Sequence, residues 1–281
     1  MTRRIEQEFI QLQALGWDNL PIDEFGIRKP KIVGGEIIHF PQDSWDENTA
    51  ATENAGYWAQ HRAKSIAALL LHHKVSVLWE IGAGNGNVAI NLKKYDIDVI
   101  AVEPLEAGAR ILSNASLPTY QATLDQLSLP DCSLGAIGLF DVLEHLDKPR
   151  ELLSEVSRVL KPGGVLICSV PAHQWLFSDF DERIGHFRRY SMKSLRKEIR
   201  ASGFQDYDSH FLFGFLLIPA FVTRRIPYLL GRRRNLEQVS RSTMTAGKLG
   251  DMFNSLINAI LVFEERLKPI SGLSILMVAK K

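Results

Sequence analysis

The sequence predicts an α/β fold in which helices cover a buried, mostly parallel sheet. Between residues 50 and 210, short apolar runs alternate with segments of helical spacing. These runs lack the polar alternation of a half-exposed strand, so both faces of the sheet are expected to be buried. A glycine-rich loop follows the first run and opens a helix. At 281 residues and 46% hydrophobic residues, the chain is long enough for one large domain or a domain with an appendage.

The apolar runs and the stop signals place the elements in order. Strands are predicted at 75–81, 99–102, 119–121, 136–140, 165–170, 204–211 and 274–279. Helices are predicted at about 3–15, 50–72, 88–94, 105–114, 151–160, 193–201 and 250–266, with a turn at 161–164. Residues 16–48 predict irregular structure with a strand at 31–40. We therefore expect an N-terminal cap at 1–48 and a main domain at 49–281, with a helical insertion at about 211–270 before the last strand.

Charge and cysteine content exclude several classes of protein. The chain has 33 Lys and Arg against 32 Asp and Glu, so no overall positive field attracts nucleic acid and no nucleic-acid partner is expected. Its two cysteines, Cys132 and Cys168, are too few for a disulfide framework or a cysteine-type zinc site. The N-terminus lacks the apolar stretch of a signal peptide. These features predict a cytoplasmic location.

The glycine loop Glu80-Ile-Gly82-Ala-Gly84-Asn-Gly86 predicts a nucleoside-binding site. Glycines there allow a sharp turn and a close approach of a ligand to the backbone, and the helix start supplies unpaired N–H groups. Glu103 stands at the end of the next predicted strand, where a carboxylate accepts both hydroxyl hydrogens of a ribose.

The same loop leaves a second cofactor open. Residues 84–89 also satisfy the pattern G-x-G-x-x-A of dinucleotide-binding enzymes, which would make the chain a nicotinamide-dependent oxidoreductase. Glu80 argues against this, because a carboxylate two residues before the first glycine repels a pyrophosphate. It suits a ligand that carries an ammonium group at that end.

Five ordered motifs resemble those of class I S-adenosylmethionine-dependent methyltransferases. The loop at 80–86 resembles their first motif, and 102–104, 122–131, 140–146 and 160–164 resemble the segments that follow it. The resemblance covers about residues 50–210 and is greatest to the bacterial type 11/23 enzymes that act on small molecules. It implies a Rossmann-like, doubly wound sheet with an antiparallel last strand and S-adenosyl-L-methionine as the cofactor.

The resemblance assigns cofactor contacts to the first three motifs. Gly82 and Gly84 would approach the methionine part of the cofactor, and Glu103 and Pro104 would hold the ribose. Leu124 would offer its backbone N–H to adenine. The family usually has Asp directly before that residue, where this chain has Thr123. Either Thr123 makes a weaker contact or Asp125 replaces it.

Further cofactor contacts are implied around the sulfonium. Phe140 and Asp141 would end the fourth strand beside it. On the helix before the first strand, Trp58 and Arg62 resemble an aromatic–arginine pair, and Arg62 would clamp the methionine carboxylate. Arg62 as an exposed surface residue is the alternative.

Three segments could carry the acceptor site: Glu144-His145, residues 171–190, and the insertion at about 211–270, which could line a lipophilic pocket. His145 follows the fourth strand, where it reaches the floor of the pocket or makes a structural hydrogen bond. Residues 171–190 follow the fifth strand and are rich in polar and aromatic side chains. There we expect His186 to be a general base or acceptor contact, and Tyr190 to bind the acceptor with Arg188 and Arg189. An internally hydrogen-bonded loop is the alternative.

The sequence disfavours methylation of exocyclic amines, methylation of cytosine C5 and a metal site. The fourth strand ends without the Pro-Pro motif of enzymes that methylate exocyclic amines, and neither cysteine follows a proline as a cytosine C5 nucleophile requires. The spacing of Asp141, Asp179, Asp181 and His186 is not diagnostic of a metal site, so no metal is predicted.

The apolar run 211–222 and the arginines after it suggest a surface role for the insertion. The run is too short to span a bilayer. Peripheral membrane contact or a homodimer through 211–234 is expected, with a core helix as the alternative. We therefore expect methyl transfer to a small-molecule or lipid-linked acceptor, at oxygen. The alternatives are the oxidoreductase and a non-catalytic binding subunit of the same fold.

Overall fold

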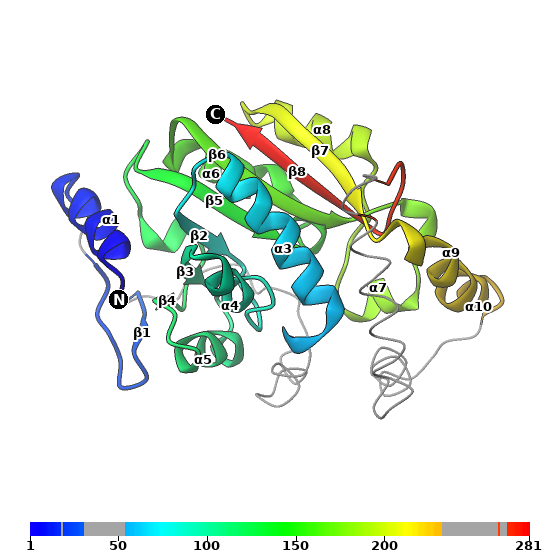
Figure 1. The fold of residues 1–281 in the computed structure, drawn as a ribbon, viewed down its shortest axis with the longest axis horizontal. Helices are drawn as coiled ribbons and strands as arrows, with labels where there is room; N and C mark the ends of the chain where they lie inside the picture. The colour runs from blue at the N-terminus through cyan, green and yellow to red at the C-terminus, as the bar shows by residue number, and fades with distance from the viewer. Residues whose placement is uncertain (18, 31–53, 232–263, 265–268) are drawn as a thin grey trace.

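An eight-stranded mixed sheet forms the centre of the molecule (Figure 1). The computed structural model describes residues 1–17, 19–30, 54–231, 264 and 269–281. The strand order is β1-β4-β3-β2-β5-β6-β8-β7, and all pairs are parallel except those of β8, which runs antiparallel to β6 and β7. The strands are β1 (Ile27–Arg28), β2 (Val77–Ile81), β3 (Asp98–Val102), β4 (Thr119–Tyr120), β5 (Leu134–Phe140), β6 (Leu160–Pro171), β7 (Gln205–Leu212) and β8 (Ser274–Lys280).

Helices cover both faces of this sheet, as Figure 1 shows for α3 and α4 in front and α8 behind. One core packs α1, α6 and α8 against the sheet, and the other packs α3, α4 and α5. The described helices are α1 (Arg3–Ala14), α3 (Tyr57–His72), α4 (Ala89–Leu92), α5 (Glu106–Asn114), α6 (Pro149–Val159), α7 (Asp179–Arg183), α8 (Met192–Ala201), α9 (Leu217–Ala220) and α10 (Ile226–Leu229). This three-layer arrangement confirms the predicted Rossmann-like fold and its antiparallel last strand.

Local sequence explains why these elements form. Alternate residues of β2 enter opposite cores: Leu78 joins one, while Trp79 and Ile81 join the other. Helix α6 begins with Pro149 in its first turn and buries residues at helical spacing. Helix α8 begins with a capping box formed by Ser191 and Ser194. The sequence thus supports each layer both by pattern and by capping.

The N-terminal segment is fastened to the sheet by aromatic residues. Trp17 lies near Trp79 and Tyr120, with ring centroids 6.3 and 6.0 Å away, and its Nε1 donates to the Leu127 carbonyl at 2.8 Å. Residues 27–28 form β1 at the edge of the sheet, beside β4. Sequence reasoning missed this strand because two residues give no periodicity. The predicted domain boundary at residue 48 and the predicted strand at 31–40 lie outside the described residues.

The other predicted elements occur with small shifts of their ends. The turn expected at 161–164 falls within the bounds of β6, at an irregularity in its pairing with β5, where Gly163 has φ +78°. The apolar run 211–222 does not form one core helix. It ends β7, turns at Phe213 with φ +62°, and continues as short helical segments to Leu229. The helix predicted at 250–266 lies outside the described residues apart from Glu264.

Candidate active site

The glycine loop lies at the carboxyl end of β2 and is fastened to β3. The N–H groups of Gly82 and Ala83 both donate to the Val102 carbonyl, at 2.8 and 3.2 Å. Gly82 has φ +72°, and a Cβ there would stand 2.7 Å from Cγ2 of Val142. Positive φ combined with this close approach requires glycine. The loop therefore touches the segment that follows β5.

Glu103, at the end of β3, is held by two backbone N–H groups. Its Oε2 accepts from Gly84 and its Oε1 from Leu105, both at 2.8 Å. The side chain is buried, and burial raises its pKa to about 7, although the two N–H groups lower it. These bonds fix the carboxylate beside the glycine loop and leave lone pairs for further donors. Pro104 is half-buried next to it.

Glu80 and Arg62 occupy the interior between β2 and α3. Burial raises the pKa of Glu80 to about 8, while the charge of Arg62 lowers it and that of Glu103 raises it. Arg62 is buried and not an exposed surface residue. Its Nη1 donates to Asp141 Oδ2, and Asp141, at φ +56°, also accepts from Ser169 Oγ at 3.2 Å. The structure therefore pairs Arg62 with Asp141, a contact that the sequence did not predict.

Two aromatic residues, Trp58 and Phe140, precede Arg62 and Asp141 in their respective segments. Trp58, one turn before Arg62, stacks on Phe213 with ring centroids 3.6 Å apart. Phe140 is buried at the end of β5 and belongs to the same core as α3. Phe140 thus lies directly before Asp141, as the sequence predicted.

The loop after β4 holds Thr123 and Leu124. Leu124 is buried, and the N–H of Thr123 donates to Gln126 Oε1 at 2.9 Å. The hydroxyl of Thr123 is buried and has no hydrogen bond to any residue that the structure describes, whereas Asp125 is exposed. A buried hydroxyl without a partner favours Thr123 over Asp125 as a ligand contact.

Several buried polar atoms that have no hydrogen bond within the described part of the chain come from the segments where β2, β4 and β5 end. Each such atom is costly unless something else satisfies it, so the group marks a polar ligand site. This region therefore holds polar atoms that suit the hydrogen-bond donors and acceptors of the cofactor. The atoms are Arg62 Nε, Glu80 Oε2, Asn87 Oδ1, Gln121 Oε1, Thr123 Oγ1 and both carboxylate oxygens of Glu144.

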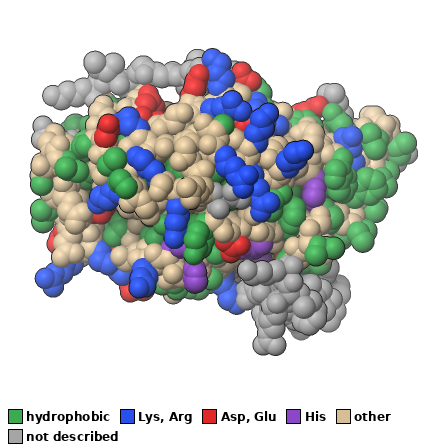
Figure 2. Space-filling model, turned by 90° about the horizontal axis from the view of Figure 1, so that it is seen from above, with side chains coloured by type: hydrophobic (Ala, Val, Ile, Leu, Met, Phe, Trp, Pro, Cys, Tyr) green, Lys and Arg blue, Asp and Glu red, His purple; other side chains and the backbone are tan. Residues whose placement is uncertain are grey.

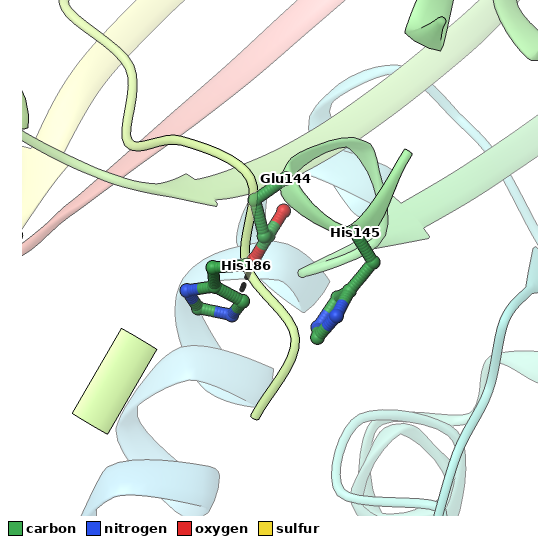
Figure 3. Close-up of side chains that lie close together, drawn as sticks. All are labelled: Glu144, His145 and His186. Atoms are coloured by element: carbon green, nitrogen blue, oxygen red, sulfur yellow. Dashed lines mark ion pairs between the residues drawn. The ribbon is translucent and has the colours of Figure 1, made fainter. Parts of the chain in front are cut away.

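Glu144, His145 and His186 form a second cluster beyond Asp141 (Figure 3). Glu144 and His145 lie on a short turn after β5, and His186 lies on the loop after α7. Glu144 is fully buried; burial, then the charge of Asp141, raises its pKa well above its usual range. Burial and the neighbouring His186 lower the pKa of His145 to about 4, so its imidazole is neutral at pH 7.

His186 is oriented by a buried carboxylate. Its Nδ1 lies 2.9 Å from Asp181 Oδ1, and its Nε2 lies 3.8 Å from Glu144 Oε1. Asp181 also accepts from Arg189 Nε at 2.7 Å and from the N–H of Ser178 at 2.9 Å. Burial opposes ionisation of Asp181, but the contacts with His186 and Arg189 outweigh it and lower its pKa. The sequence singled out His186 but not Asp181 as its orienting partner. The Ser-x-x-Asp spacing of a capping box at 178–181 was the available signal.

The remaining candidates have internal partners. Tyr190 is buried and its hydroxyl donates to the Leu143 carbonyl at 3.2 Å. Arg188 donates to the Asp147 carbonyl at 2.9 Å. The four residues considered for a metal do not form one ligand set, because Asp179 pairs with Arg183 and Asp181 with Arg189. Glu144 lies beside His186 instead, and the sequence named it together with His145 but assigned it no role of its own.

An apolar helical segment packs against α7 and the turn before it. Residues 214–229 contact 175–182 through Arg225 Nη1 on the Phe177 carbonyl at 2.5 Å and Tyr228 Oη on Glu182 Oε1 at 2.7 Å. Figure 2 shows hydrophobic side chains gathered at the end of the molecule where α9 and α10 lie. The most exposed of them are Ile218, Val222, Leu229 and Leu230, which are 51–75% exposed. No helix among the described residues is both long and apolar enough to cross a membrane.

Comparison with known proteins identifies the class. Residues 55–209, which are 155 of the 281 residues, match the family model of a methyltransferase domain, so the chain belongs to that family. It is 27% identical over 157 residues to a probable methyltransferase of Aspergillus luteorubrus, covering 47% of this chain and 55% of that protein. It is also 27% identical over 143 residues to the 27-O-demethylrifamycin SV methyltransferase of Amycolatopsis mediterranei (strain S699), covering 47% and 50%.

Solved structures share the fold. A Thermotoga maritima S-adenosylmethionine-dependent methyltransferase, described as a possible histamine N-methyltransferase, aligns with a TM-score of 0.53. The identity is 19%, and the alignment covers 84% of this chain and 94% of that one. The chain spans about half the length of the curated relatives it matches. The family supports the predicted cofactor, S-adenosyl-L-methionine, and disfavours the nicotinamide alternative.

Proposed function

We propose that this protein transfers a methyl group from S-adenosyl-L-methionine to an oxygen of a small-molecule or lipid-linked acceptor. The observation that carries the proposal is the position of the Glu144, His145 and His186 cluster directly beyond the cofactor-binding edge. Val142 touches the glycine loop, Asp141 pairs with Arg62, and Glu144 follows within the same turn. Cofactor contacts and proton-accepting groups therefore share one edge of the sheet.

The cofactor roles follow from the contacts around the glycine loop. Gly82 and Gly84 let the methionine part approach the backbone. Glu103, oriented by two N–H groups, accepts the ribose hydroxyls beside Pro104. The unpaired hydroxyl of Thr123 takes the adenine amino group, with Leu124 beside it.

Arg62 and Glu80 serve the charged end of the cofactor. Arg62 has five N–H donors, and its Nη1 is bound to Asp141. The remaining donors suit the methionine carboxylate, and Glu80 suits the ammonium group. Phe140 and Asp141 then flank the sulfonium at the end of β5.

The reaction is an in-line displacement that depends on alignment. S-adenosyl-L-methionine supplies a methyl group whose bonding electron pair stays on sulfur when the acceptor oxygen takes the carbon. A hydroxyl acceptor must also lose its proton, which His145 and His186 are placed to promote. Tyr190 donates to the carbonyl directly before Glu144, so we assign it a positioning role instead of the predicted acceptor contact.

Two observations support oxygen and an amphiphilic acceptor. A relative is named for methylation of 27-O-demethylrifamycin SV, which is an oxygen acceptor. The exposed apolar segment 214–230 contacts residues 177–182, which precede the loop that carries His186. A lipid-linked or apolar acceptor gains contact with that surface while its hydroxyl reaches the cluster.

Calorimetric titration with S-adenosyl-L-methionine, S-adenosylhomocysteine and NADH tests the cofactor. We expect micromolar binding of the first two and none of NADH. Acceptor screening with phenolic and lipid-linked hydroxyl compounds then tests the reaction, with His186→Ala as the variant. Full turnover in His186→Ala refutes its catalytic role. Cofactor binding without turnover on any hydroxyl compound, in the presence of divalent ions, favours a non-catalytic subunit.

We also propose that the segment 214–230 contacts a lipid surface. Arg224 and Arg225 flank its exposed apolar residues, a combination that suits anionic lipid. Co-sedimentation with phosphatidylglycerol vesicles should weaken with salt and in Ile218→Ser. Ile10→Ser is the matched control, because Ile10 is 63% exposed on α1 at the other end of the molecule. A shift to dimer on concentration, without vesicle binding, would assign the surface to a second copy instead.

A further inference from the structure

Three side chains with metal-binding atoms converge from two separate segments. Glu144 and His145 come from the turn after β5, and His186 comes from the loop after α7. One ligand atom from each lies within 4.8 Å of the others (Figure 3). Two imidazoles and a carboxylate are a frequent protein ligand set for a divalent transition-metal ion that keeps positions open.

Glu144 gives an independent indication of a ligand. Its side chain is 0% exposed, and neither carboxylate oxygen accepts a hydrogen bond within the described residues. The nearby arginines are already paired, Arg62 with Asp141 and Arg189 with Asp181. The charges of these arginines favour the ionised form of Glu144, but neither donates a hydrogen bond to it. A buried carboxylate without hydrogen bonds is costly, and a bound cation offsets the cost.

Asp181 prepares His186 for metal binding. The Asp181 carboxylate lies 2.9 Å from Nδ1, so we assign the ring proton to that nitrogen. The lone pair of Nε2 then faces Glu144. Carboxylate–histidine–metal arrangements of this kind fix the tautomer and the ring orientation of a ligand. Arg189 and Ser178 hold Asp181 in turn.

The spacing suits an ion between these groups. Zinc lies about 2.1 Å from imidazole nitrogen and carboxylate oxygen, so two atoms on one ion are at most about 4.2 Å apart. His186 Nε2 and Glu144 Oε1 are 3.8 Å apart. The ring of His145 stands edge-on to that of His186, with centroids 4.6 Å apart. Because the three ligand atoms lie within 4.8 Å of one another, they must move closer together to share one ion.

We propose that Glu144, His145 and His186 bind one divalent transition-metal ion, and that the acceptor oxygen occupies an open position on that ion. Imidazole ligands favour later transition-metal ions such as Zn²⁺ and Co²⁺ over Mg²⁺ and Ca²⁺. The role in binding the acceptor rests on the proposed function, whereas ion binding does not. An ion at this position would withdraw charge from a bound hydroxyl, so His145 and His186 would promote its deprotonation as ligands.

Titration of the full chain, with any purification tag removed, tests the site. Co²⁺ is the probe, followed by its visible absorption and by competition with Zn²⁺ and Mg²⁺. We expect one equivalent of Co²⁺, displaced by Zn²⁺ but not by equimolar Mg²⁺. Glu144→Gln and His186→Gln should weaken binding by more than about tenfold, and Asp181→Asn by about 10–100-fold. His72→Gln, which removes an exposed histidine on α3, should leave it unchanged.

S-adenosylhomocysteine binding by each variant shows that it is folded. A protein that binds this nucleoside but not Co²⁺ overturns the metal site, as does equal Co²⁺ affinity in Glu144→Gln and wild type. Equal affinity for Mg²⁺ overturns the class of ion. If Co²⁺ binds as expected but a chelator leaves methyl transfer unchanged, the role in acceptor binding is overturned and the ion site stands. If the wild-type protein does not bind S-adenosylhomocysteine, this result contradicts the proposed function and not the metal site.

Discussion

The cofactor half and the acceptor half of the site are held in place by different means. In the cofactor half, around β2, β3 and β4, backbone groups do most of the positioning: Gly84 and Leu105 N–H groups orient Glu103. In the acceptor half, around β5 and α7, side chains position side chains, as Asp181 and Arg189 do for His186. The first arrangement depends on chain geometry, whereas the second depends on individual functional groups.

The two halves should therefore respond differently to substitution. Removing a side chain in the cofactor half leaves the backbone donors in place, but adding a Cβ to the glycine loop moves them. In the acceptor half, one conservative change of a carboxylate to an amide disturbs several partners at once. Each prediction below compares a change in one half with a matched change elsewhere.

The largest expected effect is from adding one methyl group to the glycine loop. Gly82→Ala places a Cβ 2.7 Å from Val142 Cγ2 at φ +72°, so the loop must shift. We expect S-adenosylhomocysteine affinity to fall about 100-fold by calorimetry, an estimate that combines a clash with the positive-φ cost of roughly 1–2 kcal/mol. Gly163→Ala has a similar φ, +78°, with open space around it, and should cost only stability. Equal affinities in the two variants would contradict the distinction between the halves.

The second prediction concerns pH and the buried carboxyls of the cofactor half. Glu80 and Glu103 have pKa values of about 8 and about 7, raised from 4.5 by burial. The folded state therefore holds protons that the unfolded state has released, so stability falls as pH rises from about 4.5 to 8. Arg62 opposes the shift at Glu80, and Glu103 adds to it.

Urea unfolding of the ligand-free protein at pH 5.5 and pH 8.5 measures this. We expect a loss on the order of 5 kcal/mol, since the two carboxyls together account for about four pKa units above pH 5.5 and each unit corresponds to roughly 1.4 kcal/mol. Glu80→Gln should remove about half of that loss, while Glu151→Gln, at an exposed position on α6, should keep it. An unchanged pH dependence in Glu80→Gln would mean that Glu80 is ionised in the folded protein.

The difference between the halves also explains what the sequence predicts. The glycine loop, Glu103 and Thr123 lie in short continuous segments at fixed distances from strand ends, so the pattern alone locates them. The hydrogen bonds from Gly84 and Leu105 to Glu103 follow from such local geometry. The doubly wound sheet and its antiparallel last strand followed from the family resemblance, and the structure has both.

The acceptor half could not be deduced in the same way. Glu144 matters because it lies beside His186, 42 positions away. Asp181 contacts His186 from only five positions away, and the capping-box spacing marks a helix start but not this contact. The Arg62–Asp141 pair joins α3 to the end of β5, so its prediction required the three-dimensional fold. The short strand β1 was missed because two residues carry no periodicity.

The third prediction tests whether Arg62 binds the methionine carboxylate of the cofactor in addition to pairing with Asp141. Arg62→Lys keeps a charge but loses the planar fork of donors. We expect S-adenosylhomocysteine to bind about tenfold more weakly, because a charge-assisted hydrogen bond contributes roughly 1.5–3 kcal/mol. 5′-Methylthioadenosine lacks the methionine carboxylate, so its affinity should change by less than about twofold. Equal losses for the two nucleosides would limit Arg62 to its pairing with Asp141.

The smallest expected effect separates two buried tyrosines, one in each half. Tyr190 Oη donates to the Leu143 carbonyl, and Tyr120 Oη donates to Asn19 Oδ1 at 2.6 Å. Replacing either with Phe removes one hydrogen bond, so each should cost about 1 kcal/mol of unfolding free energy. Only Tyr190→Phe should also lower kcat for the acceptor, by about two- to fivefold at unchanged S-adenosylhomocysteine affinity, because its partner directly precedes Glu144. If Tyr120→Phe lowers kcat equally, the effect is one of general stability and Tyr190 has no positioning role in the acceptor half.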